Sequence, residues 1–166
     1  MSSGSSSRRK ITDRPKLFDN FIPTSGTDEQ LTVEFSMACK RVLIADDLES
    51  ILETVVALVQ DSFNIVGMAS DGRTALAAVL KLEPDLVVLD ISMAGMTGIE
   101  VARELKCRGN KTKIVFLTVH EDSDIIATCL SVGALGYVLK ALMDSDLIPA
   151  MNEALAGRVF VSRLLS

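Results

Sequence analysis

From Arg41 onwards, short apolar runs alternate with amphipathic segments along the chain. Five of the runs are rich in Val, Ile and Leu and are rarely interrupted by polar residues: Val42–Ala45, Phe63–Ala69, Leu86–Leu89, Ile114–Leu117 and Leu135–Leu139. Parallel strands that are buried on both faces have this unalternated pattern. The runs therefore predict five parallel strands.

Between and after these runs, apolar residues recur at the three- and four-residue spacing of one helix face. The residues at this spacing are Leu48, Ile51, Leu52, Val55, Val56 and Val59, then Ala75, Leu76, Val79 and Leu80, then Ile99, Ala102 and Leu105, then Ile125, Ile126 and Cys129, and finally Ile148, Met151 and Leu155. Helices that alternate with strands predict an α/β fold with a doubly wound five-stranded parallel sheet, strand order 2-1-3-4-5.

Residues 1–40 differ from the rest of the chain. They begin with a Ser-rich stretch, contain Pro15 and Pro23, and show no sustained hydrophobic period. This pattern predicts a flexible N-terminal arm. The alternative is a docking arm, because three of the six phenylalanines, Phe18, Phe21 and Phe35, lie in it.

Composition narrows the function classes. The chain has 166 residues, of which 48% are hydrophobic and 23% charged, which suits one globular domain. Residues 1–40 carry a net charge of +1 and residues 41–166 a net charge of −6. Since proteins bind DNA largely through cations that neutralise phosphates, we expect no nucleic-acid binding by this chain alone.

Location and redox state follow from two further features. No apolar stretch reaches the roughly 18 residues of a membrane span, and no apolar region follows the basic residues of the N-terminus. We therefore expect a cytoplasmic protein with no membrane association. The three cysteines, Cys39, Cys107 and Cys129, have neither a disulfide nor a zinc-site spacing and are predicted to be reduced thiols.

Polar residues directly follow four of the predicted strands. Asp46 and Asp47 follow the first, Asp90 the third, Thr118 the fourth and Lys140 the fifth. Sheets of this kind bind ligands outside the carboxyl ends of their strands. Taken singly, each of these residues is more often a turn, cap or surface residue, so only their combination favours a site.

The combination suits phosphoryl transfer. Three adjacent carboxylates repel one another unless a cation joins them, which makes the cluster a candidate Mg²⁺ site. The Lys140 ammonium and the Thr118 hydroxyl suit phosphoryl oxygens. Phosphoryl transfer is catalysed mainly by positioning and charge neutralisation, so these residues predict an acceptor site.

Four motifs resemble a known family. They are Val42 to Asp47, Pro84 to Met93, Phe116 to Thr118 and Gly133 to Lys140, and they closely resemble the motifs of receiver domains of bacterial two-component response regulators. The resemblance covers about residues 41–157 and implies the flavodoxin-like receiver fold for that domain. Residues 158–166 are then a C-terminal tail or the start of a linker.

The resemblance also implies roles for individual residues. Asp90 would be the phosphoacceptor, and Asp47, Asp90 and the backbone carbonyl of Ser92 would bind Mg²⁺, with Asp46 acting mostly through water. By the same resemblance, His120, two residues after Thr118, and Ser92, two residues after Asp90, would tune water access to the acyl phosphate.

Partners and signal transmission are implied in the same way. Thr118 and Lys140 would bind phosphoryl oxygens, and Thr118 with Tyr137 would form the switch pair. The phosphoryl group would come from a histidine kinase, a phosphotransfer protein or a small acyl phosphate. Phosphorylation would draw Thr118 inward, let Tyr137 rotate inward, and change a surface for partners or a homodimer. This surface comprises helix 4, strand 5 and helix 5 of the predicted order, including Ile125, Ala134 and Leu142.

By this resemblance the chain is a signalling domain that catalyses only its own phosphorylation and dephosphorylation. A haloacid-dehalogenase-type phosphatase needs an Asp two residues after its nucleophile, but Ser92 follows Asp90 at that distance. A flavin or nucleotide carrier needs a phosphate-binding turn where Asp46–Glu49 would repel phosphate. A receiver used as a constitutive docking module stays open, although the complete acceptor set disfavours it.

The end of the chain resembles one subfamily of receivers. Gly133–Lys140 and Gly157–Ser162 are similar to receivers that carry a C-terminal helix-turn-helix domain. A DNA-binding output of that kind would need roughly 60 further residues. The resemblance therefore implies either a stand-alone receiver or the receiver of a longer protein.

Overall fold

The computed structural model of the chain describes residues 39–163. The predicted arm over residues 1–40 lies outside the described residues except for its last two positions, and so do residues 164–166.

Strands and helices alternate along the described part of the chain. The strands are β1 (Arg41–Ala45), β2 (Asn64–Ala69), β3 (Leu86–Leu89), β4 (Lys113–Thr118), β5 (Gly136–Leu139) and β6 (Phe160–Val161). The helices are α3 (Glu49–Val59), α4 (Gly72–Leu82), α5 (Gly98–Cys107), α6 (Ser123–Ser131) and α7 (Met143–Leu155), and a 3₁₀ turn, η2 (Lys140–Leu142), joins β5 to α7.

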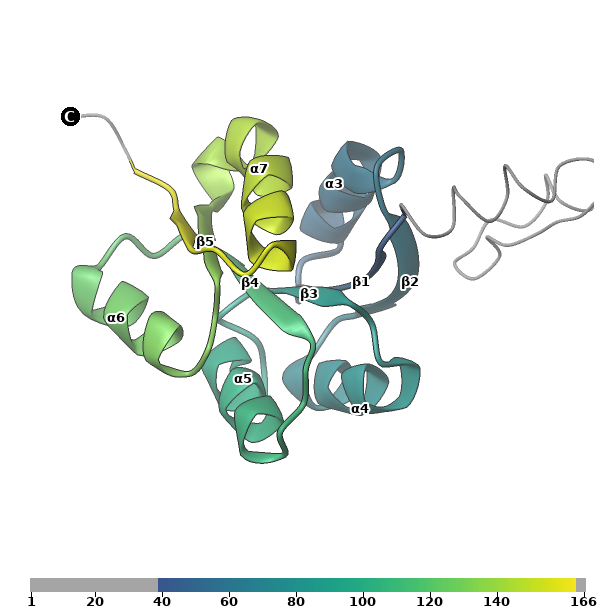
Figure 1. Cartoon of the computed structure of the whole chain (residues 1–166), viewed down its shortest axis with the longest axis vertical. Helices are drawn as coiled ribbons and strands as arrows, with labels where there is room; N and C mark the ends of the chain where they lie inside the picture. The colour runs from purple at the N-terminus through teal and green to yellow at the C-terminus, as the bar shows by residue number, and fades with distance from the viewer. Residues whose placement is uncertain (1–38, 164–166) are drawn as a thin grey trace, which may run out of the picture.

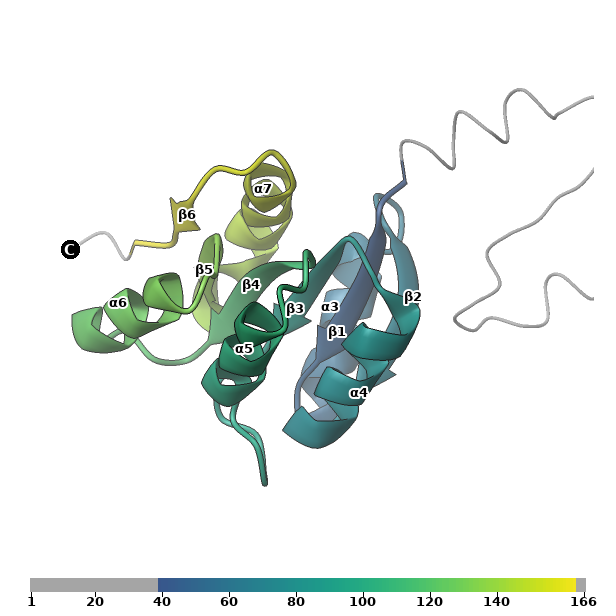
Figure 2. The same ribbon diagram turned by 60° about the horizontal axis from the view of Figure 1, so that its bottom comes forward.

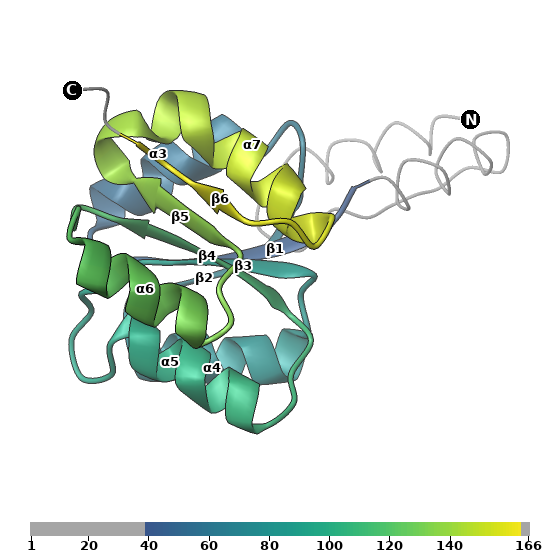
Figure 3. The ribbon, with the colours of Figure 1, turned by 60° about the vertical axis from the view of Figure 1, so that its left-hand side comes forward.

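The strands form one parallel sheet in the order β2-β1-β3-β4-β5-β6. The predicted order of the first five strands is confirmed. The sixth strand was not predicted: Phe160 and Val161, from the segment expected to be a tail, pair with Gly136 and Tyr137. Figure 3 shows β6 lying along β5 at the edge of the sheet.

Helices cover both faces of the sheet, with α3 and α7 on one face and α4, α5 and α6 on the other (Figures 1 and 2). Neighbouring residues of a strand point to opposite faces, so Val42 and Ile44 enter the core under α3 and α7, whereas Leu43 enters the core under the other helices. Both cores need apolar residues, which explains why the strand sequences do not alternate.

Short polar side chains cap the N-termini of all three helices on the face that α4, α5 and α6 cover. The Asp71 carboxylate accepts a hydrogen bond from the Thr74 backbone N–H at 2.8 Å at the start of α4. The Thr97 hydroxyl oxygen accepts one from the Glu100 backbone N–H at 3.2 Å at the start of α5. Each contact satisfies a backbone donor that has no partner within its helix.

Among the described residues, the structure has no helix that combines the length and apolar character needed to cross a membrane.

Candidate functional site

Two aspartates are held at the carboxyl edge of the sheet by their own backbone. The Asp46 N–H donates to Ala69 O at 3.1 Å, and the Asp90 N–H donates to Ala45 O at 2.9 Å. Each residue therefore continues the hydrogen-bonding pattern of the sheet by one position after its strand ends. This places the two carboxylates on adjacent strands, as expected at the switch point of the sheet.

Three carboxylates converge at this edge. Asp46, Asp47 and Asp90 each offer an oxygen, and these oxygens lie within 4.8 Å of one another. Asp46 is 1% exposed and Asp90 4% exposed, whereas Asp47 is exposed to solvent. Asp46 Oδ1 accepts a hydrogen bond from the Leu48 N–H at 2.9 Å, which fixes the orientation of its carboxylate.

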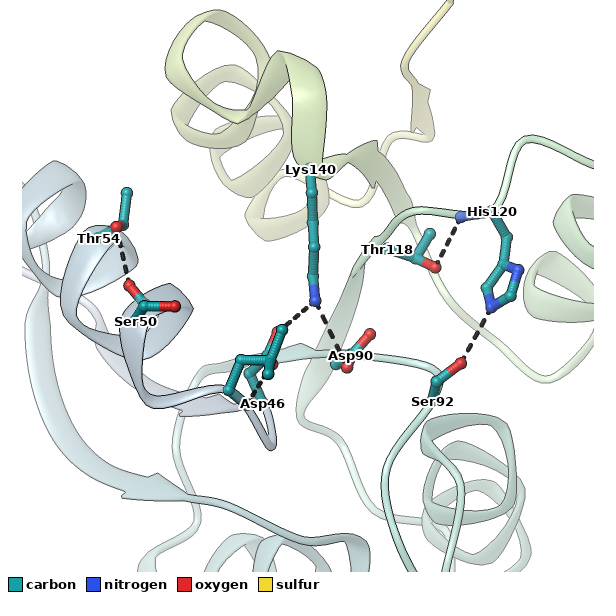
Figure 4. A network of polar contacts seen from close by, with 9 residues as sticks. Asp46, Ser50, Thr54, Asp90, Ser92, Thr118, His120 and Lys140 are labelled. Carbon is teal, nitrogen blue, oxygen red and sulfur yellow. Dashed lines mark hydrogen bonds and ion pairs between the residues drawn. The ribbon is translucent and has the colours of Figure 1, made fainter.

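Lys140 points into this cluster from the end of β5 (Figure 4). Its Nζ lies 2.8 Å from Asp46 Oδ2 and 3.5 Å from Asp90 Oδ2. Asp46 Oδ2 accepts no hydrogen bond of good geometry within the described residues, so its contact with Nζ is an ion pair without well-directed hydrogen bonding. One ammonium thus faces three carboxylates, and the cluster carries a net negative charge.

This arrangement fits a divalent cation. The donors are all carboxylate oxygens, which Mg²⁺ prefers, and one of them, Asp46 Oδ2, is buried without a well-directed hydrogen bond. A second positive charge would offset the repulsion that Lys140 leaves uncompensated. The structure therefore brings together the carboxylates of the predicted metal site, while the predicted role of the Ser92 backbone carbonyl stays a prediction.

The environment of Asp90 disfavours its charged form. Burial raises the pKa of the Asp90 carboxyl, and the Asp46 carboxylate raises it further. The Lys140 ammonium and a hydrogen bond from the Ser92 backbone N–H lower the same pKa, but they do not reverse the shift. A cation at the cluster would favour the ionised carboxylate, which is the nucleophilic form of this group.

His120 connects the other predicted residues. Its backbone N–H donates to Thr118 Oγ1 at 3.1 Å, its Nε2 lies 3.0 Å from Ser92 Oγ, and its backbone carbonyl accepts from the Tyr137 hydroxyl at 2.7 Å. The Thr118 oxygen is the acceptor in its bond, so its hydroxyl proton stays available for a ligand. The sequence suggested only a kinetic role for His120 and did not show that its backbone binds both Thr118 and Tyr137, the predicted switch pair.

Tyr137 already occupies the inward position expected after phosphorylation. Its side chain is 0% exposed, and burial raises the pKa of its hydroxyl to about 12. The surface that was predicted to change on phosphorylation differs from the prediction in one residue. Ala134 is buried in the core, whereas Ile125 and Leu142 are partly exposed. Ala134 therefore supports this surface from beneath.

Gly98 is a site residue that the sequence did not single out. A Cβ at this first residue of α5 would lie 2.1 Å from the backbone oxygen of Asp90, and the Gly98 N–H donates to Ile91 O at 2.8 Å. Only glycine lets the helix approach the Asp90 backbone this closely. The sequence signal was a glycine directly after the cap residue Thr97, which also occurs without such a contact.

We expect Gly98→Ala to destabilise the domain by about 1–3 kcal/mol, the usual range for overpacking, because the Asp90 backbone must move to admit the methyl group. Chemical denaturation measures this. Gly67→Ala is the matched control, since its Cβ would meet side chains alone, the flexible end of Leu82 at 3.2 Å and that of Leu43 at an ordinary 3.7 Å. Equal stability losses in the two variants would contradict the special role of Gly98.

The fold and the site define a doubly wound α/β domain with a cluster of three carboxylates and a lysine at its switch point. The family model of the response regulator receiver domain matches residues 42–152. The chain belongs to this family. The assignment agrees with the sequence, which already disfavoured a phosphatase and a flavin carrier.

Individual relatives agree with this assignment. The chain is 32% identical over 128 residues to the nitrate/nitrite response regulator protein NarL of Escherichia coli, covering 75% of this chain and 59% of NarL. It is 35% identical over 127 residues to the transcriptional regulatory protein YvfU of Bacillus subtilis, covering 75% of this chain and 64% of YvfU. The chain thus spans about three fifths of the length of these relatives.

Two solved structures have a backbone fold similar to that of this chain. A two-component response regulator of the LuxR family from Aurantimonas superposes with a TM-score of 0.70 at 28% identity, covering 74% of this chain and 89% of that one. The isolated receiver domain of RcsB from Salmonella enterica, solved with the phosphomimetic BeF₃⁻, superposes with a TM-score of 0.69 at 25% identity, covering 75% and 94%.

Proposed function

We propose that this receiver domain is a phosphorylation switch in which Asp90 accepts the phosphoryl group. An Asp90 carboxylate oxygen forms a bond to phosphorus while the bond between phosphorus and the donor breaks, and the donor leaves with the bonding electron pair. The donor is a histidine kinase, a phosphotransfer protein or a small acyl phosphate. The observation that carries this proposal is the convergence of Asp46, Asp47, Asp90 and Lys140 at one edge of the sheet.

The residues around Asp90 would have separate roles in the transfer. Asp46, Asp47 and Asp90 would hold Mg²⁺, which supplies positive charge and coordination positions for phosphoryl oxygens when bound. Lys140 offers an ammonium for one phosphoryl oxygen, and the Thr118 hydroxyl proton offers a hydrogen bond to another. Charge neutralisation and positioning are what phosphoryl transfer requires.

Transmission runs from Thr118 through His120 to Tyr137. The Thr118 oxygen and the Tyr137 hydroxyl both bind the backbone of His120. A phosphoryl group that draws Thr118 toward Asp90 therefore changes the position of the carbonyl that holds Tyr137. The phosphorylated state favours the inward tyrosine, which is a shift in a population that exists without phosphate.

The test of the acceptor is intact-mass analysis after incubation with acetyl phosphate. We expect one added phosphoryl group in the presence of Mg²⁺ and little addition when the metal is chelated. A second stoichiometric phosphoryl group would contradict a single acceptor. Addition that ignores Mg²⁺ would contradict the metal site.

Asp47→Ala tests the metal site separately, because Asp47 is the exposed carboxylate of the cluster and contributes least to the fold. We expect Mg²⁺ affinity to fall about 10-fold or more and phosphorylation to slow, as the cation loses one charged oxygen ligand. Isothermal titration with Mg²⁺ measures this, with Asp144→Ala, an exposed carboxylate in α7, as the control. Equal affinities in Asp47→Ala and wild type would show that the ion binds elsewhere.

The partner surface has to be revised to include β6. A homodimer through helix 4, strand 5 and helix 5 of the predicted order would use α6, β5 and α7, and the outer edge of β5 is occupied by the chain's own strand β6. A partner would therefore contact β6 and the flanking helices. A cytoplasmic location and the absence of nucleic-acid binding by this chain stay predictions.

A further inference from the structure

Residues 158–163, here called the C-terminal segment, are attached to the switch strand through their backbone. The Phe160 N–H donates to Leu135 O and the Ser162 N–H donates to Tyr137 O, both at 2.8 Å. The second bond joins the segment to Tyr137 itself. The C-terminal segment therefore contacts the residue on which the proposed switch depends.

A buried hydroxyl strengthens this attachment. Ser162 is 5% exposed, and its hydroxyl donates to Asp146 Oδ2 of α7 at 2.6 Å while accepting from the Leu139 N–H at 3.3 Å. One side chain thus ties the C-terminal segment to both α7 and β5. A buried hydroxyl that both donates and accepts a hydrogen bond favours a single position of its segment. Moving the segment would leave buried polar groups without partners.

Val161 stands beside the ring of Tyr137. The two residues are register partners in the parallel pair of β5 and β6, so their side chains lie on the same face of the sheet. Val161 packs against the core cluster that contains Tyr137. On the other side, Phe116 of β4 is the register partner of Tyr137 and belongs to the same cluster. The tyrosine side chain is therefore flanked by Phe116 and Val161.

The edge of the sheet is the side on which the tyrosine ring can reach solvent. β4 closes the opposite side, and the views in Figures 2 and 3 show β6 lying over the β5 edge between α6 and α7. A ring that turned outward would enter the space that Val161 fills. Because Val161 is the register partner of Tyr137, we expect the docked segment to oppose an outward turn of the ring past this edge.

We propose that the outer edge of β5 is a docking surface for the chain's own C-terminal segment, and that docking is thermodynamically linked to the phosphoryl group on Asp90. The proposal rests on the proposed function, in which phosphorylation favours inward Tyr137. Inward Tyr137 favours the docked segment, so each event strengthens the other by the same factor. Whatever follows residue 163 is then positioned according to the state of Asp90.

The test uses the full chain, in which Tyr137 is the one tyrosine and tryptophan is absent. Tyrosine fluorescence therefore reports on Tyr137 alone. Ser162→Ala removes the hydroxyl contacts and Val161→Ala removes the side chain beside the ring. Ser145→Ala is the matched control, because Ser145 donates to the other oxygen of Asp146, Oδ1, at 2.9 Å and belongs to α7.

We expect acrylamide to quench the tyrosine fluorescence of both segment variants more strongly than that of wild type and Ser145→Ala. Amide exchange at Phe160 should accelerate about 10-fold in Ser162→Ala, the effect of losing buried hydrogen bonds. Beryllofluoride with Mg²⁺ should slow exchange at Phe160 and Ser162 in wild type. Both segment variants should bind beryllofluoride more weakly than the control.

Two results would overturn the proposal. One is unchanged quenching in both segment variants, which would show that the segment does not hold the tyrosine. The other is equal exchange of the wild-type segment with and without saturating beryllofluoride, which would show that docking and the acceptor are not linked. Quenching needs no phosphodonor, and intact mass reports phosphorylation of Asp90 separately, so failure of the acceptor assignment is distinguishable from failure of the docking surface.

Discussion

Asp90→Asn is expected to abolish phosphorylation by acetyl phosphate, because an amide cannot act as the attacking carboxylate. Intact mass with Mg²⁺ present should show no added group, while wild type gains one. Asp85→Asn, an exposed aspartate just before β3, is the control and should accept the group normally. Full phosphorylation of Asp90→Asn would move the acceptor to another residue.

The same variant should be more stable than wild type at neutral pH when metal is chelated. Burial and the neighbouring Asp46 carboxylate raise the folded-state pKa of Asp90 above its unfolded value. The protonated carboxyl therefore favours the fold, and this contribution is present below the unfolded pKa and is lost as pH rises through the folded one. Asparagine stays neutral throughout. Thermal unfolding should show a gain at neutral pH that disappears in acid, and a stability loss at neutral pH would contradict this account.

Lys140→Met is expected to give the largest loss of stability, about 3–5 kcal/mol in metal-free buffer. The substitution keeps an aliphatic stem but leaves Asp46 and Asp90 without the cation that lies 2.8 Å and 3.5 Å from their oxygens. Removing one partner of a buried ion pair is costly because the remaining charges are buried and unpaired. Denaturant unfolding measures the change.

Lys106→Met is the control for this measurement, because Lys106 is exposed and its ammonium donates to the Ser131 backbone carbonyl at 3.0 Å. We expect it to change stability by about 1 kcal/mol or less. Added Mg²⁺ should restore part of the loss in Lys140→Met, since a cation at the carboxylates replaces the missing charge. Similar losses in the two lysine variants would show that Lys140 does not neutralise the cluster.

The sequence by itself determined the order of the first five strands and the polar residues at the carboxyl edge of the sheet. Unalternated apolar runs such as Leu86–Leu89 predict strands buried on both faces, and this strand is observed with the same bounds. Strand ends were less certain: the run Ile114–Leu117 became Lys113–Thr118 because backbone pairing with β3 and β5 continues beyond the apolar residues. A local pattern is enough to locate a strand, because each strand buries side chains that lie next to one another in the sequence.

Only the tertiary structure decided what depends on contacts between distant parts of the chain. The two residues of β6 are too few to show a hydrophobic period, and they form a strand because the edge of β5 and the Asp146 carboxylate are available to bind them. Gly98 is required because the start of α5 meets the Asp90 backbone. Tyr137 donates to the His120 carbonyl and pairs in register with Val161, two residues that other parts of the chain supply. Such contacts are set by packing in three dimensions, which the spacing of residues along the sequence does not encode.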